Sequence, residues 1–155
     1  MIVEICDNKL KRKIAIDILG SLTPSWFLID EPSRYIDNDA NMFFAFKARD
    51  EFVAFVAIKK HYESSYEIHV MGVKPTHFNN KIGTKLLDHV EDLLRSKNGK
   101  LFFLETVGEN SIDDKDYYEP TRAFYEHRGF IKMFLSNDKS NWNEGYPRLI
   151  YAKSL

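Results

Sequence analysis

The sequence predicts a single α/β domain built on a mixed sheet with helices on its faces. The chain has 155 residues, which is enough for one compact domain and short for two. Segments of strand and helix character alternate along it. A helical crossover makes the middle strands parallel, whereas tight turns make the early and late strands antiparallel. We therefore expect residues 1–155 to form one domain.

The first part of the chain alternates strands with helical segments. Leu10, Ile14, Ile18 and Leu22 lie four residues apart, which predicts an amphipathic helix. Phe52–Ile58 is a run of seven apolar residues, typical of a strand covered on both faces. The expected elements here are a strand at 2–6, a helix at 9–22, a short helix around Glu31–Ile36, and strands at Met42–Ala48 and Phe52–Ile58.

The second part contains the clearest helix of the chain. Its apolar positions are Ile82, Leu86, Leu87, Val90, Leu93 and Leu94, and Asn98-Gly99 ends it. The other expected elements are strands at Tyr66–Val73, Leu101–Val107, Phe130–Leu135 and Arg148–Lys153, and a short helix at Thr121–Arg128. A long acidic loop precedes that short helix.

Charge and composition argue against several classes of function. The chain has 22 basic and 23 acidic residues, so it lacks the excess of positive charge that is typical of nucleic-acid-binding proteins. No basic-then-apolar leader and no apolar run of about 18 residues is present, so we expect a cytoplasmic protein with no membrane partner. Cys6, the only cysteine, lies in an apolar alternation and is expected to be a buried structural thiol.

The segment between the strand ending at Val73 and the long helix has features of a phosphate site. The helix begins near Asn79 to Gly83, and helix N-termini present unpaired N–H groups and a partial positive charge. Lys74, Lys81 and Lys85 add positive charge. An ordinary strand-to-helix crossover with solvated lysines has the same pattern, so this segment alone leaves that alternative open.

Two separate motifs together resemble the GNAT N-acetyltransferase superfamily. Val73-x-Pro75 followed by residues 80–87, Asn-Lys-Ile-Gly-Thr-Lys-Leu-Leu, resembles its acetyl-CoA loop, and residues 121–130 resemble its A-x-x-F-Y-x-x-x-G-F segment. A bacterial subgroup also shares Trp26-Phe27, Glu67–Val73 and Tyr118–Glu126. The likeness covers nearly the whole chain and implies the GNAT fold. The usual loop is R/Q-x-x-G-x-G/A, and this chain has Phe78 and Lys81 instead of the leading Arg or Gln and the first Gly.

The resemblance implies acetyl-CoA as co-substrate and assigns residues to it. Backbone groups of Met71, Gly72 and Val73 are expected to hold the pantetheine arm and the thioester carbonyl, with one N–H as oxyanion donor. The residues expected to cradle the pyrophosphate are Phe78, Asn79, Asn80, Lys81, Ile82, Gly83 and Thr84. Asn110 is expected to contact the cofactor after the next strand.

Acetyl transfer to an amine needs a base, because an alkyl amine with a pKa near ~10.4 is almost wholly protonated at neutral pH. Glu67, which shares a strand face with His69, is the expected base. The alternative is that Glu67 is an ordinary surface carboxylate. Tyr125 matches the tyrosine that the family places beside the CoA sulfur as general acid. Without the resemblance, Tyr125 would be a core aromatic.

The acceptor is expected to be a small primary amine such as an amino acid, polyamine or amino sugar. Trp26, Phe27 and Tyr35 are expected to roof its pocket, and Glu105 to favour a cation, together with other acids. Two alternatives stay open: acetylation of a protein N-terminus or lysine, and a non-catalytic CoA-binding regulatory module, which the departures at Phe78 and Lys81 would suit. A homodimer is possible. The histidines lack metal-ligand spacing, so no metal is expected.

Overall fold

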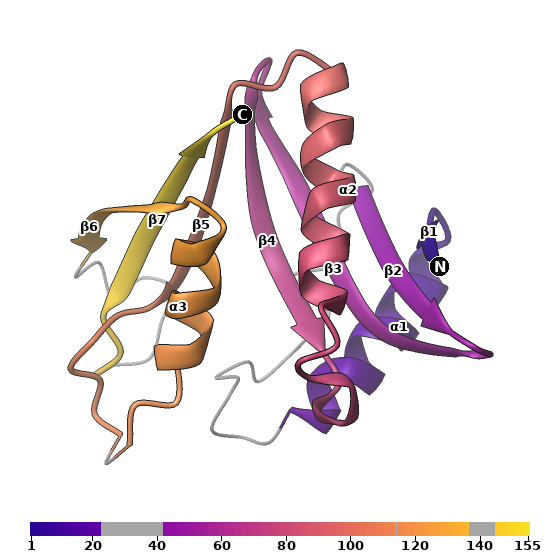
Figure 1. Cartoon of the computed structure of the whole chain (residues 1–155), viewed down its shortest axis with the longest axis horizontal. Coiled ribbons are helices and arrows are strands. Elements are labelled where there is room, and N and C mark those ends of the chain that lie inside the picture. The colour runs from indigo at the N-terminus through magenta and orange to yellow at the C-terminus, as the bar shows by residue number, and fades with distance from the viewer. Residues whose placement is uncertain (23–41, 114, 137–144) are drawn as a thin grey trace.

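The computed structural model describes residues 1–22, 42–113, 115–136 and 145–155, and within them seven strands form one sheet with helices on both faces (Figure 1). The strands lie in the order β1-β2-β3-β4-β5-β7-β6. The elements are β1 Ile2–Glu4, α1 Asn8–Ser21, β2 Met42–Ala48, β3 Glu51–Tyr62, β4 Ser65–Val73, the 3-10 turn η2 Pro75–His77, α2 Ile82–Ser96, β5 Leu101–Val107, α3 Glu119–His127, β6 Ile131–Ser136 and β7 Arg148–Ser154.

Among the described strands, the junction between β4 and β5 differs from the others in direction and in how it ends. These two strands are parallel, whereas the other neighbours are antiparallel. Their register runs only from Ser65↔Leu101 to Ile68↔Leu104. Beyond Ile68 the strands diverge, and Figure 1 shows the wedge that opens between them. We call the four paired positions the seam; its closed end lies at the start of β4, and its open end lies where the strands part.

The two faces of the sheet carry different helices. α1 packs on one face, where Ile14 and Ile18 join a core with Phe55 and Val70. α2 and α3 lie on the opposite face (Figure 1). The core on that face includes Ile82, Leu86, Leu87, Val90, Leu94, Tyr125, Phe130 and Tyr151, together with inward side chains of β3, β4 and β5. Apolar positions three and four residues apart on α2 place its buried stripe against the sheet.

A bulge in β4 changes which side chains face which helix. Ala57 pairs with Val70 and Ile58 with Ile68, so His69 is the extra residue between them. Before the bulge Ile68 faces the α2 side, and after it Val70 faces the α1 side. Glu67 lies between two α2-facing residues, Tyr66 and Ile68, and therefore points to the face opposite α2.

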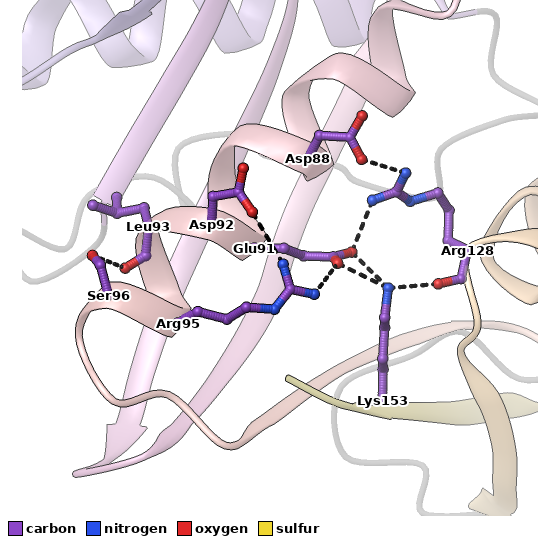
Figure 2. Close-up of polar contacts among 8 residues, drawn as sticks. All are labelled: Asp88, Glu91, Asp92, Leu93, Arg95, Ser96, Arg128 and Lys153. Carbon is purple, nitrogen blue, oxygen red and sulfur yellow. Dashed lines mark hydrogen bonds and ion pairs between the residues drawn. The ribbon is translucent and has the colours of Figure 1, made fainter.

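An ion-pair network ties α2, α3 and β7 together on the α2 face (Figure 2). At its centre is Glu91, whose side chain is 3% exposed. Lys153 Nζ donates to Glu91 Oε2 at 2.8 Å, Arg128 Nη2 to Oε1 at 3.0 Å, and Arg95 Nη2 to Oε2 at 3.1 Å. Burial opposes ionisation, but Lys153 and Arg128 outweigh it and hold the pKa of Glu91 below its usual value. The network joins the two parts of the sheet near the closed end of the seam.

The expected mixed α/β sheet is confirmed, with two differences in detail. The strand predicted at Phe52–Ile58 continues to Tyr62, because its polar end pairs with the start of β4. Cys6 is exposed rather than buried, since β1 ends at Glu4 and the cysteine lies in the connection to α1. The helix expected around Glu31–Ile36 lies outside the described residues. No helix in the described ranges is long and apolar enough to cross a membrane.

Candidate active site

Tyr125 lies on the α2 side of the open wedge. It stands in α3, is 7% exposed, and packs edge-on against Phe124 and Phe130. Its hydroxyl points at the sulfur of Met71 on β4, 4.0 Å away. Burial raises the pKa of Tyr125 well above its usual range, so the phenol keeps its proton at neutral pH. A buried, protonated hydroxyl aimed across the wedge at β4 can donate a proton there.

Glu67 lies on the other face, at the next-to-last pair of the seam. Its side chain is 14% exposed, and His61 Nε2 at the end of β3 lies 2.5 Å from Glu67 Oε2. His69 Nδ1 lies 3.8 Å from Oε1. Burial pushes the pKa of Glu67 up, but His69 and His61 outweigh that effect and lower it. Glu67 is therefore an ionised carboxylate that two imidazoles contact.

Glu105 joins this cluster from β5. It follows the last seam pair and lies on the same strand face as Phe103, whose ring is 5.2 Å from that of His61. Arg148 Nε on β7 lies 3.7 Å from Glu105 Oε2. Burial raises the pKa of Glu105, Arg148 opposes the rise, and the charge of Glu67 adds to it. The structure thus brings Glu67, His69 and Glu105 together at the point where the sheet opens.

His61 and Arg148 are members of this cluster that the sequence did not assign to it. The predicted strand stopped at Ile58, which placed His61 in a turn instead of beside β4. A longer hairpin register, in which Lys59 pairs with Glu67, would have found it. Arg148 could have been found from its place opposite Val107 at the end of β5.

The loop before α2 has the backbone of an anion site. Asn79 and Lys81 both have left-handed φ angles, of 63° and 57°. No side chain caps the start of α2, and the helical bonding begins with Lys85 N to Lys81 O at 3.0 Å. The first backbone N–H groups of the helix therefore lack a side-chain acceptor and can receive an anion.

Side chains around this loop show why a glycine is needed at position 83. A Cβ on Gly83 would lie 3.2 Å from Met71 Cε and 3.3 Å from Phe124 Cζ, so the glycine lets α2 start close to β4 and α3. Two of the three lysines expected to add charge here are engaged elsewhere. Lys74 bridges Asp17 at 2.7 Å and Glu51 at 2.5 Å, and Lys85 lies over the Phe46 ring.

The remaining residues assigned to the cofactor are distributed along the open end of the wedge. Met71, Gly72 and Val73 form the end of β4, past its last pair with β5. Phe78, Asn79, Asn80 and Lys81 are exposed, Ile82 is buried, and Gly83 and Thr84 are half-buried. Asn110 is exposed with a φ of 61°, in a loop that bonds through Gly108 and Ile112 to the chain before β7.

The predicted roof of the acceptor pocket, Trp26, Phe27 and Tyr35, lies outside the described residues. Several loop acids instead line a separate hollow of about 420 Å³ beside α3. Its lining residues are Glu109, Asp116, Glu119, Arg122, Ala123, Glu126 and Lys132. Arg122 is buried there and bonds to Asp116 and to the carbonyl oxygen of Val107. Among the described residues, no group of three or more metal-binding side chains is arranged to hold a metal ion.

Comparisons with known proteins show the family and agree with the fold. The sequence model of the acetyltransferase (GNAT) family matches residues 14–130. A GNAT-family protein from Desulfovibrio desulfuricans superposes with a TM-score of 0.79 at 21% identity, covering 99% of both chains. No curated protein sequence matches the chain.

Two further solved structures resemble the chain. An aminoglycoside 6'-N-acetyltransferase complexed with coenzyme A has a TM-score of 0.75 at 22% identity, covering 99% of this chain and 96% of that one. The Escherichia coli ribosomal-protein-S18-alanine N-acetyltransferase has a TM-score of 0.76 at 16% identity, covering 99% of this chain and 94% of that one. At these identities the likeness shows the fold.

Proposed function

Because the chain belongs to the GNAT acetyltransferase family, we propose that it transfers the acetyl group of acetyl-CoA to the primary amine of a small molecule. The observation that carries the proposal is the wedge between β4 and β5. An uncapped helix start lies beside it, a protonated tyrosine lies on one side, and a carboxylate cluster lies on the other.

The residues at the wedge fit acetyl-CoA. The free N–H groups at the start of α2, with the left-handed Lys81 before them, suit a pyrophosphate. Residues 69–73 of β4 lack a β5 partner, so their backbone can bond an extended pantetheine arm. When bound, acetyl-CoA supplies an activated thioester. Met71, Gly72 and Val73 are the residues that would lie along it, and Phe78 to Thr84 would hold the phosphates.

Tyr125 has the position and protonation state of a general acid. Its hydroxyl faces Met71, beside the strand that would carry the thioester end. A thiol near a pKa of ~8.5 leaves without much help, so the contribution of this proton is at the low end of acid catalysis, about a hundredfold. Glu67, on the opposite side of the sheet, is the group beside which the amine loses its proton.

The charge near the open end favours a cationic acceptor. Glu67 and Glu105 lie together there on one face, and a protonated amine is attracted to carboxylates in a half-buried setting. One protein of similar fold is an aminoglycoside 6'-N-acetyltransferase, whose name states that it acetylates an aminoglycoside. We therefore prefer a small cationic amine over a peptide.

The first test is calorimetry with acetyl-CoA, followed by thiol release against aminoglycosides, polyamines, amino acids and short peptides. We expect binding, and release with a small cationic amine. Release with peptides alone would mean a protein acetyltransferase, and binding without release on any amine would favour a regulatory module. Absence of binding would refute the assignment of the α2 loop.

Tyr125→Phe separates catalysis from binding. We expect kcat to fall about a hundredfold while the Kd for acetyl-CoA stays within twofold, because only the donated proton is removed. Tyr118→Phe is the matched control, since Tyr118 precedes the first residue of α3 and has Asp113 and Tyr146 as its titratable neighbours. Unchanged turnover in Tyr125→Phe would remove the tyrosine from the mechanism.

A further inference from the structure

The contact between His61 and Glu67 is the shortest polar contact in the cluster around Glu67. His61 comes from the polar end of β3, which the bulged hairpin with β4 places beside Glu67. The distance from His61 Nε2 to Glu67 Oε2 is 2.5 Å, which is a short hydrogen bond, whereas His69 Nδ1 is 3.8 Å from Oε1. The His61 ring also packs on Phe103, which restricts its orientation.

This contact determines the tautomer of the neutral imidazole. An ionised carboxylate only accepts hydrogen bonds, and the lowered pKa of Glu67 keeps it ionised at neutral pH. His61 Nε2 must therefore carry a hydrogen and donate it to Glu67. Nδ1 is then left with the lone pair that can accept a second proton.

We propose that the Glu67–His61 pair is the proton acceptor of the reaction, with Nδ1 of His61 taking up the proton that the acceptor amine loses. Glu67 orients the imidazole and stabilises the imidazolium that forms, which is the role that a carboxylate has beside a catalytic histidine. This inference rests on the proposed acetyl transfer and adds to it the atom that receives the proton.

The relative strengths of the two bases favour this assignment. An ordinary imidazole is roughly a hundredfold stronger base than an ordinary carboxylate. The contacts of Glu67 with His69 and His61 lower its pKa further, which makes the carboxylate alone a poorer final acceptor. The same contacts make it a good partner for a positive charge on His61. Glu67 therefore serves the reaction best by supporting the histidine.

His61 is in contact with solvent and has several charged or titratable side chains around it. The side chain is 31% exposed, so an imidazolium there can release its proton to solvent. The charged and titratable groups around the pair are Glu67 and His69 on β4, Glu105 on β5, Arg148 on β7 and, next to it on β3, Lys60, which pairs with Glu63.

The proton balance of the reaction is complete with these groups. A protonated primary amine carries three hydrogens and the amide product keeps one. One proton leaves through His61 to solvent, and its bonding electrons remain on nitrogen as the lone pair that attacks the thioester carbon. The C–S bond breaks, and Tyr125 gives its proton to the thiolate sulfur. The nitrogen then loses a second proton, which replaces the one that Tyr125 gave away. The products are the amide, free thiol and one proton in solution.

The test is the pH dependence of kcat/KM for an amine that supports thiol release. In His61→Gln the amide keeps a donor for Glu67 but cannot accept the proton. We expect kcat/KM to fall about a hundredfold at neutral pH and to recover as the pH rises, because free amine then becomes abundant. The Kd for acetyl-CoA should be unchanged.

Chemical rescue by imidazole provides a second test, which would give no effect if the role of His61 were purely structural. In His61→Ala, added imidazole should restore a substantial part of the lost rate, since the site is open to solvent. His127→Ala is the control: His127 is exposed at the end of α3, away from the cluster, and should keep the wild-type rate and show no rescue.

A wild-type rate and pH profile in His61→Gln, or loss without any imidazole rescue in a folded His61→Ala, would overturn the proposal. A wild-type protein that releases no thiol with any amine would instead refute the proposed function. The two failures are therefore distinguished by the wild-type assay itself.

Discussion

Two glutamates on opposite faces of the β4–β5 seam differ in the kind of partner that surrounds them. Glu91, on the α2 face, is contacted by Arg128, Lys153 and Arg95 (Figure 2). Glu67, on the other face, is contacted by His61 and His69. Both carboxyls are largely shielded from solvent, and in both the partners outweigh burial and lower the pKa. The difference between them lies in what the partners can do.

Arginine and lysine stay charged across the whole range in which the protein folds, whereas imidazole gains and loses a proton near neutral pH. Glu91 is therefore locked into permanent ion pairs and can only hold elements together. Glu67 is instead paired with imidazoles, which are side chains that can accept and release a proton. The seam thus has a structural carboxylate at its closed end, and Glu67, which we propose to be the reactive one, lies near the point where the strands part.

The largest effect on stability should come from disrupting the ion pairs of Glu91 near the closed end of the seam. Glu91→Gln removes the charge that Arg128 and Lys153 share while keeping the volume. Because it leaves buried cations without their counterion, we expect the free energy of unfolding to fall by about 3–5 kcal/mol. Glu67→Gln should cost only about 1 kcal/mol, since neutral histidines can bond an amide. Urea unfolding of both variants checks this, and equal losses would contradict the distinction.

A pH scan of stability sharpens the same contrast. The pKa of Glu91 is lowered in the folded protein from its ordinary value of 4.5. A depressed carboxyl pKa stabilises the fold above the unfolded value, and this stabilisation is lost as the pH falls through the folded value. Wild-type protein should therefore lose stability below about pH 4.5 more steeply than Glu91→Gln. Parallel pH profiles of the two proteins would show that the ion pairs contribute nothing.

The smallest effect concerns the α2 loop at the open end. Lys81 adopts a left-handed φ of 57° where the family loop usually has glycine. Lys81→Gly should therefore stabilise the protein by at most about 1 kcal/mol, with little change in acetyl-CoA affinity if backbone N–H groups bind the phosphates. Asn79→Gly is the matched control and should gain less, because asparagine tolerates φ 63° well. A tenfold loss of affinity in Lys81→Gly would assign the phosphate contact to the side chain.

Much of the fold could be predicted because local patterns and tertiary structure agree. The strands Met42–Ala48 and Leu101–Val107 have the predicted bounds. The buried face of α2 contains the apolar residues that the periodicity indicated, among them Ile82, Leu86 and Val90. The loop before α2 was assigned to phosphate binding from Gly83 and its neighbours, and that assignment stays a prediction. The two motif segments then lie on α2 and α3, whose starts both face the wedge (Figure 1).

Other features depend on contacts between distant segments, which no local pattern shows. The bulge at His69 and the extension of β3 to Tyr62 bring His61 to Glu67, and neither follows from hydrophobic alternation. Glu91 occupies a position on α2 that its sequence alone would assign to solvent, and its buried state depends on Lys153, sixty-two residues later. Cys6 was wrongly expected in the core because the strand ended earlier than its apolar run.

The most direct measurement is the rate of thiol release per folded molecule for wild type, Glu67→Gln and Glu91→Gln, with one amine and saturating acetyl-CoA, at a temperature where all three are folded. We predict that Glu67→Gln loses about a hundredfold in kcat/KM, while Glu91→Gln stays within about threefold of wild type. A wild-type rate in Glu67→Gln, or an equal loss in Glu91→Gln, would contradict the separation of a reactive carboxylate from a structural one.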